Sequence, residues 1–146
     1  MYYNFIDEDT NENNVSEEYL NSMEEKLGIK YPDVLREFYL KHNDATLKEF
    51  SFEMCIQKQD LEFSVDFIIP MKYGNVCVEK VLEFNKGNDY IPKTYMPLAE
   101  DVLSEDFYWD SASGKVFYIS MGNVENPIPI CNSVDEFFEI LNKSCE

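Results

Sequence analysis

In the first part of the chain, up to about residue 43, the apolar residues recur at helical spacing. Ser16 as an N-cap and Gly28 as a stop enclose one predicted helix, and Pro32 fits the first turn of a second helix that ends near His42-Asn43. The apolar stripes of these helices are Tyr19, Leu20, Met23 and Leu27, and then Val34, Leu35, Phe38 and Tyr39. Spacing by three or four residues is typical of a helix with one buried face.

Beyond residue 50 the apolar residues alternate with polar ones. Alternation over 50–54 and 63–69 predicts two half-buried strands. Gly74-Asn75 ends this pattern, and the apolar residues of 78–84 predict a short third helix that stops before Gly87.

The last third predicts a strand, a hairpin and a final helix. Residues 95–99 form the strand, in which Pro97 indicates an edge position or a bulge. The apolar runs 107–109 and 116–119 flank a turn-rich tip. Ser133 and Glu136 form a capping box, which starts the last helix.

This order of elements predicts an α+β fold rather than a doubly wound parallel sheet, because strands and helices do not alternate regularly. We expect a single domain over 16–146, with a mostly antiparallel or mixed sheet flanked by about four helices. Residues 1–15 are polar and acidic and are expected to form a loosely held acidic leader. The 146 residues are enough for one domain with its own apolar core.

Charge narrows the possible partners. Twelve basic and 29 acidic residues give a net charge of −17. Such a field repels phosphate groups, so direct binding to nucleic acid or to an anionic membrane is disfavoured, whereas a basic protein partner is attracted. Solubility alone is the alternative explanation of the charge.

The cysteines and the start of the chain indicate a cytoplasmic protein. The four cysteines form no C-x-x-C pair, the first residues lack a basic segment followed by an apolar one, and no apolar run approaches about 20 residues. The four are Cys55, Cys77, Cys131 and Cys145.

Motifs for catalysis, cofactors and metals are missing from the sequence. His42 is the only histidine, and its place at a helix end favours a structural role. There is no P-loop and no G-x-G-x-x-G. We therefore expect a protein that is not an enzyme and has no cofactor, no metal and no catalytic residue. An enzyme that uses carboxylates remains an alternative, and it would need two carboxyl groups facing each other in a deep cleft.

The best candidate for partner binding is the segment from Ala99 to Gly114, which contains five acids and no Lys or Arg. Acidic groups around exposed aromatic rings combine steering by charge with rigid apolar area. Period two predicts that one of the two neighbouring rings faces solvent. The alternative is an ordinary solvated loop with both rings in the core. The candidate partner-binding residues are Glu100, Asp101, Glu105, Asp106, Asp110, Tyr108 and Trp109.

Three blocks of the sequence, taken in order, resemble the SUKH superfamily (Smi/Knr-type domains). Residues 23–39, ending at His42-Asn43, are similar to the family's "E-x-x-L-G-x-x-L-P-x-x-L-x-x-F-Y…N-G". Residues 91–101 are similar to its "lP-x-x-y-x-P-f-A-x-D" strand. The third block joins 107–110, 114–117 and the closing 133–138, which looks like "S-F-x-E-F-L".

The resemblance implies a sheet flanked by helices and a non-enzymatic role. Bacterial members are typically immunity proteins that bind a toxin, which is often a nuclease, and fungal members regulate cell-wall assembly. It therefore implies an antitoxin whose acidic surface occupies a nuclease-like basic toxin. A signalling or scaffold module without a toxin partner is the alternative.

Overall fold

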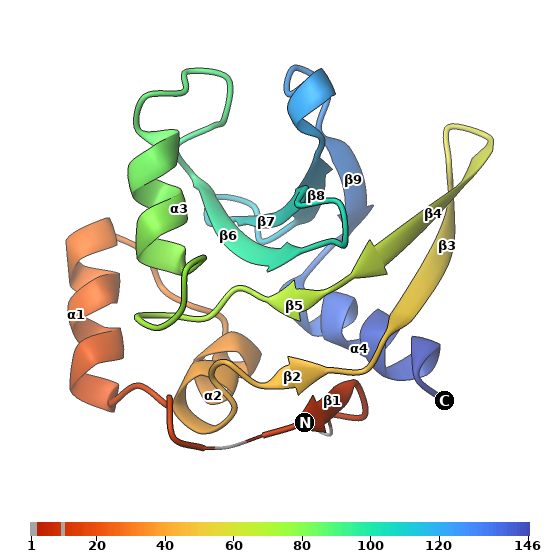
Figure 1. Ribbon diagram of the computed structural model, residues 1–146. Coiled ribbons are helices and arrows are strands. Elements are labelled where there is room, and N and C mark those ends of the chain that lie inside the picture. Colours follow the sequence, from red (N-terminus) through yellow and green to blue (C-terminus); the bar gives the residue numbers. More distant parts are fainter. Residues whose placement is uncertain (1–2, 10) are drawn as a thin grey trace.

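The computed structural model describes residues 3–9 and 11–146, which are arranged around a five-stranded antiparallel sheet (Figure 1). The helices are α1 (Glu17–Leu27), α2 (Asp33–Lys41), α3 (Val78–Asn85), the short 3-10 helix η1 (Met121–Asn123) and α4 (Val134–Ser144). The strands are β1 (Ile6–Glu8), β2 (Thr46–Leu47), β3 (Phe50–Ile56), β4 (Gln59–Val65), β5 (Phe67–Ile68), β6 (Tyr95–Glu100), β7 (Asp106–Asp110), β8 (Val116–Ile119) and β9 (Ile128–Cys131).

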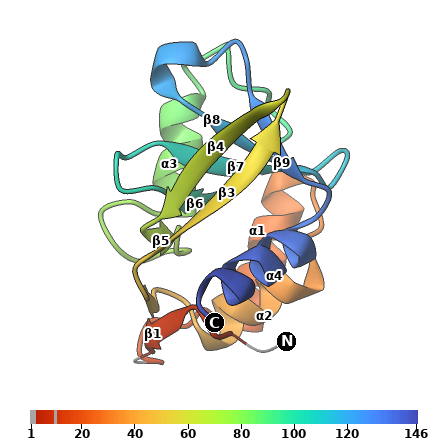
Figure 2. The same ribbon diagram turned by 90° about the vertical axis from the view of Figure 1, so that its right-hand side faces the viewer.

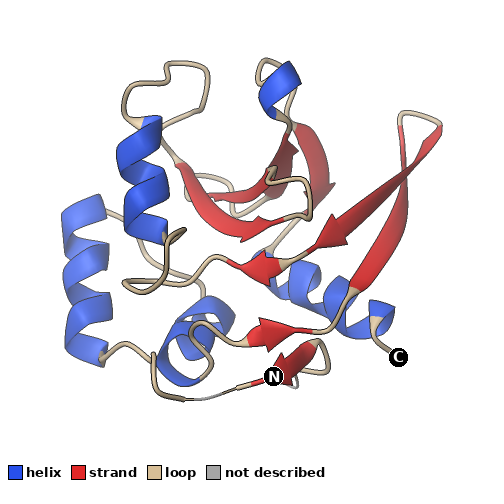
Figure 3. Ribbon diagram, viewed as in Figure 1, coloured by secondary structure: helices blue, strands red, loops and turns tan. Residues whose placement is uncertain are grey.

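All strand pairs in the described residues are antiparallel. The main sheet has the order β5-β6-β7-β8-β9, while β3 pairs with β4 and β1 pairs with β2 in two smaller sheets. Figure 3 shows α1, α2 and α3 on one side of the molecule and the β3–β4 hairpin on the opposite side. The predicted fold class is confirmed: the chain is a single α+β domain with four α-helices and antiparallel sheets.

Strand β7 lies at the centre of the sheet, and both of its faces are covered. Phe107 on one face packs against Phe137 of α4, with ring centroids 5.2 Å apart, and against Phe63 of the hairpin at 6.2 Å. Figure 2 shows the hairpin lying across the sheet, with α4 beside its base. On the other face Tyr108 forms a small cluster with Ile91 and Ile119.

The predicted helix ends are confirmed. The Ser16 hydroxyl accepts a hydrogen bond from the Tyr19 backbone N–H at 3.1 Å, and Gly28 ends α1 with a φ of 66°. Glycine adopts this left-handed conformation without the steric cost of a Cβ. The Ser133 hydroxyl likewise accepts from the Glu136 N–H at 3.0 Å.

The strands differ in detail from the prediction. Pro97 lies at a bulge, as expected, but β6 is an inner strand rather than an edge. The alternation over 50–54 and 63–69 belongs to a hairpin followed by a separate strand, β5. The hairpin turns at Gln57 and Lys58, whose φ values are 53° and 65°. Two consecutive positive φ values are typical of a tight hairpin turn, but neither residue is the usual glycine or asparagine.

The acidic leader is not loosely held, and that expectation is wrong for the described residues 3–9 and 11–15. Strand β1 pairs with β2, and Phe5 lies fully inside the core. The His42 Nδ1 atom, at the end of α2, lies 2.5 Å from Asp9 Oδ2. This contact is the structural role of His42, because the His42 ring joins the leader to the end of α2.

Asn43 joins three segments that are far apart in the sequence. Its buried side-chain amide donates to the carbonyl oxygens of Asn13 (2.7 Å) and Met71 (2.8 Å), and its Oδ1 atom accepts from the Met71 N–H at 2.9 Å. Its own backbone N–H donates to Asn14 Oδ1 at 3.0 Å. The hydrogen bonds of the Asn43 side chain thus link the leader, the end of α2 and the segment that precedes α3.

We expect Asn43→Ala to lower the free energy of unfolding by about 2–4 kcal/mol, because it leaves the buried N–H of Met71 without a partner and removes one of the two donors to the Met71 carbonyl. Urea unfolding followed by circular dichroism measures this loss. Asn75→Ala, at an exposed asparagine, is the control. Equal urea midpoints for the two variants would contradict the role of Asn43.

Candidate functional site

The seven predicted partner-binding residues lie on one continuous piece of the fold. They follow the end of β6, the turn over 101–105 and the whole of β7. β6 and β7 are neighbours in the sheet, so the structure does bring these residues together. Their exposure differs, however, and it separates them into two groups.

Asp101 is buried, and both of its carboxylate oxygens are engaged inside the protein. Oδ1 accepts from the backbone N–H groups of Leu103 (2.9 Å) and Glu105 (2.8 Å), and Oδ2 accepts from the Tyr118 hydroxyl at 2.7 Å. These bonds shape the turn between β6 and β7 and attach it to β8. Asp101 therefore organises the acidic segment and is not free to contact a partner directly.

Tyr108 and Trp109 are also buried, with exposed fractions of 3% and 2%. They point to opposite faces of β7, as period two requires, but both faces of this central strand are covered. The expectation that one of the rings faces solvent is wrong. Trp109 packs against Tyr31, with ring centroids 5.6 Å apart, so its role is in the core.

Glu100 and Asp106 are paired directly across β6 and β7. Burial, a hydrogen bond to Glu100 and the negative charge of Glu100 raise the pKa of Asp106 to about 8. The Tyr108 hydroxyl donates to Asp106 Oδ2 at 3.4 Å and accepts from the Asn85 side-chain amide of α3 at 3.2 Å. Asp106 therefore holds a proton at neutral pH, and the two carboxyl groups together carry less charge than the sequence suggests.

Glu105 and Asp110 keep part of their surface exposed and also shape their loops. Glu105 Oε2 accepts from the Met121 N–H of η1 at 2.7 Å. Asp110 accepts from the Ala112 N–H (3.0 Å) and the Ser113 hydroxyl (2.8 Å) in the turn before β8. Burial opposes ionisation of Asp110, but hydrogen bonds from Thr94, Ser113 and Ala112 outweigh it and lower its pKa.

Much of the exposed negative charge lies outside the predicted segment. Exposed acids occur on α1, on the β3–β4 hairpin and on α4, and examples are Glu17, Glu18, Glu25, Glu53, Asp60, Glu62, Asp135, Glu136 and Glu139. Within the described chain, Lys and Arg form ion pairs with carboxylates at Arg36–Glu24, Lys41–Glu37 and Lys86–Glu83. The negative surface is thus broad and little neutralised from within.

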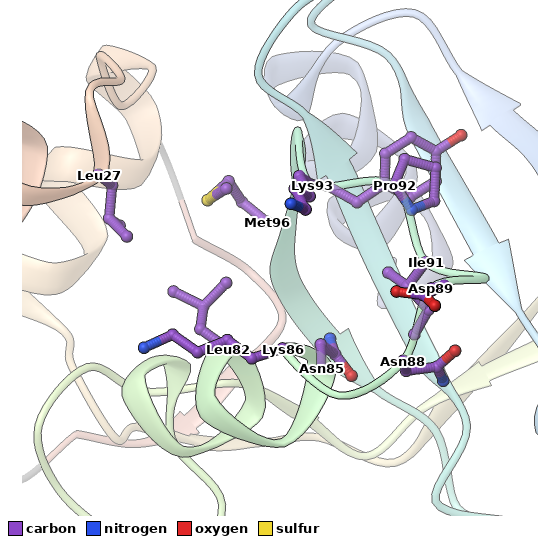
Figure 4. A pocket seen from close by; sticks show the side chains of 11 residues that line it. Leu27, Leu82, Asn85, Lys86, Asn88, Asp89, Ile91, Pro92, Lys93 and Met96 are labelled. Carbon is purple, nitrogen blue, oxygen red and sulfur yellow. The ribbon is translucent and has the colours of Figure 1, made fainter.

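A partly open hollow of about 440 Å³ lies between the end of α1, α3 and the start of β6. Figure 4 shows the side chains of Leu27, Leu82 and Met96 pointing into the same space from these three elements. Lys86 and Asp89 are among the polar residues of its lining. The apolar floor of this hollow suits an apolar group.

The carboxyl pair of Glu100 and Asp106 is not part of this hollow. Neither residue lines the hollow, and the pair lies between strands β6 and β7.

Within residues 3–9 and 11–146, no group of three or more His, Cys, Asp or Glu side chains is arranged to hold a metal ion. None of the helices found there has both the length and the apolar character needed to cross a bilayer.

Comparison with known proteins gives one match. The sequence profile of the SMI1 / KNR4 family (SUKH-1) matches residues 14–140. No curated protein matches the chain.

The raised pKa of Asp106 predicts a pH-dependent loss of stability. Its pKa is about 8 in the folded chain, against an ordinary value of 3.8. At a pH between these two values, the Asp106 carboxyl is ionised in the unfolded chain but protonated in the folded chain. The free energy of unfolding therefore falls as the pH rises from about 4 to about 8. We expect Asp106→Asn to gain stability relative to the parent over this range, measured by urea unfolding at pH 5, 7 and 9.

Asp110→Asn is the matched control, because its pKa is lowered rather than raised. The contribution of Asp110 is present above its ordinary pKa and is lost at lower pH, so this variant should lose stability relative to the parent at pH 5–9. A stability difference between Asp106→Asn and the parent that does not change from pH 5 to pH 9 would refute the raised pKa.

Proposed function

The chain belongs to the SMI1 / KNR4 family (SUKH-1), and on this premise we propose that it is a non-enzymatic immunity protein that neutralises a toxin by binding it. The partner would be a basic protein, with a nuclease as the best example. A nuclease needs a basic surface to hold nucleic acid, and an acidic protein can occupy that surface.

The observation that carries this proposal is the excess of acids that the chain does not neutralise. The net charge is −17, and the described chain pairs Lys or Arg with carboxylates at three places. Mutual repulsion among the remaining acids opposes the folded state, and a basic partner would relieve it. The alternative explanation is that the charge serves only to keep the protein soluble, and in that case the acids need no partner.

Within the predicted acidic segment, we propose that Glu100, Glu105 and Asp110 face the partner, since they retain exposed surface. Asp101, Tyr108 and Trp109 are buried, and Asp106 has a buried Oδ1 atom and is paired with Glu100 across β6 and β7. These four would act indirectly, by holding the turn and strand that present the other three. Glu100 and Glu105 flank the exposed turn residues Val102 and Leu103. This turn would be one part of a wider acidic surface.

We expect the protein encoded by the neighbouring reading frame to bind this chain with a dissociation constant that rises about tenfold or more between 50 and 500 mM NaCl, because salt screens exposed charges. Glu100→Gln with Glu105→Gln should weaken the binding and flatten its salt dependence. Isothermal titration calorimetry at both salt concentrations measures these effects.

The control is Asp135→Asn with Glu139→Gln, which removes the same charge from α4 on another part of the surface. A dissociation constant that does not change with salt would count against capture by charge. Equal weakening by the two double variants would count against the acidic turn as the contact. Absence of any toxin-like neighbour would favour the scaffold alternative.

A further inference from the structure

Three of the most exposed large apolar side chains surround one hollow. Phe84 at the end of α3, Tyr90 in the following loop and Met121 in η1 have exposed fractions of 71%, 64% and 53%. In Figure 1 this loop and η1 stand at the same end of the molecule, on either side of the sheet strands. Large apolar groups gathered around one exposed hollow are typical of a surface that is covered by a binding partner.

The hollow is held in place by contacts beneath it. Asn85, next to Phe84, donates to the Tyr108 hydroxyl of β7 at 3.2 Å. The backbone N–H of Met121 donates to Glu105 at 2.7 Å. The Asn88 side chain accepts from the Tyr90 N–H at 3.0 Å. These bonds position the backbone that carries the three apolar residues, which reduces the backbone entropy lost on binding.

The charges around the hollow identify the kind of partner. Asp89 lines it, and Glu105 contacts Met121 at its edge. The nearest lysine in sequence, Lys86, is paired with Glu83 at 3.0 Å. A second copy of this chain also carries a net charge of −17 and would place its own Asp89 against this hollow, and both charges oppose self-association. The hollow therefore fits a basic protein and not a second copy.

We propose that the Phe84–Tyr90–Met121 hollow is the apolar anchor of the interface, which receives one aliphatic or aromatic side chain flanked by Lys or Arg on a basic partner protein. The flanking cations would face Asp89 and Glu105. This inference rests on the proposed function and adds where the partner is held. Charge would bring the partner to the surface, and burial of apolar area in the hollow would slow its release.

The test measures the binding of the neighbouring-frame protein to the full chain and to three variants, at 50 and 500 mM NaCl. Phe84→Ser and Tyr90→Ser remove exposed rings and should leave the fold intact. We expect each to weaken binding about tenfold at both salt concentrations, since neither changes a charge. Cys55→Ser is the control, because Cys55 is exposed on β3, outside both the hollow and the acidic turn between β6 and β7.

The outcomes separate the two proposals. If the parent binds with salt dependence but Phe84→Ser and Tyr90→Ser bind as tightly as the parent, or no more weakly than the control variant, the anchor is refuted and capture by charge stands. If the parent does not bind, or binds with no salt dependence, the proposed function fails and the anchor fails with it. A parent dimer in sedimentation equilibrium that Phe84→Ser dissociates would assign the hollow to a second copy and overturn the inference.

Discussion

The structure depends on keeping the hydrogen bonds of three buried polar side chains. Glu24, Asn43 and Asp101 are the buried polar or charged residues of the described chain. A buried polar group without partners is costly, so each one fixes the segments that supply its partners. Glu24 accepts from the Tyr31 N–H (2.7 Å) and from the Arg36 guanidinium (2.5 Å), and so joins α1 to α2. Asn43 ties the leader to the segment before α3, and Asp101 shapes the turn between β6 and β7.

These three residues are also polar positions of the first two blocks that resemble the SUKH superfamily. Glu24 is the glutamate of "E-x-x-L-G", Asn43 is the asparagine that ends the first block, and Asp101 ends the second. In this chain the motif acids and amide serve as internal acceptors and donors. In this chain these signature residues therefore tie the elements together, and the binding surface that we propose is made of other, exposed residues. One fold can in this way carry different binding surfaces.

The sequence predicted the architecture well and the exposure of the candidate site poorly. Caps such as Ser16 and Ser133 are local signals, so they could be read without the fold. The role of Asp101 depends on Tyr118, which is distant in sequence, although its bond to the N–H two residues later is a common aspartate turn. Burial of Trp109 depends on elements that cover both faces of β7. The spacing in α3 could not settle the exposure of Phe84, because Phe84 lies two positions after Leu82, on the other side of the helix, but three after Val81, on the same side.

Electrostatic attraction acts over a longer distance than apolar contact, so the two can contribute to different steps of the binding that we propose. Electrostatic attraction extends about 10 Å at moderate salt, so a broad acidic surface mainly increases the rate of encounter. It confers little selectivity, because many basic proteins would be attracted equally. Selectivity requires a short-range contact that depends on shape, and this is the part that we propose for the apolar hollow near Glu105. The raised pKa of Asp106 fits the same division, because it reduces the negative charge beside Glu100, where repulsion between the two carboxyl groups would weaken the fold.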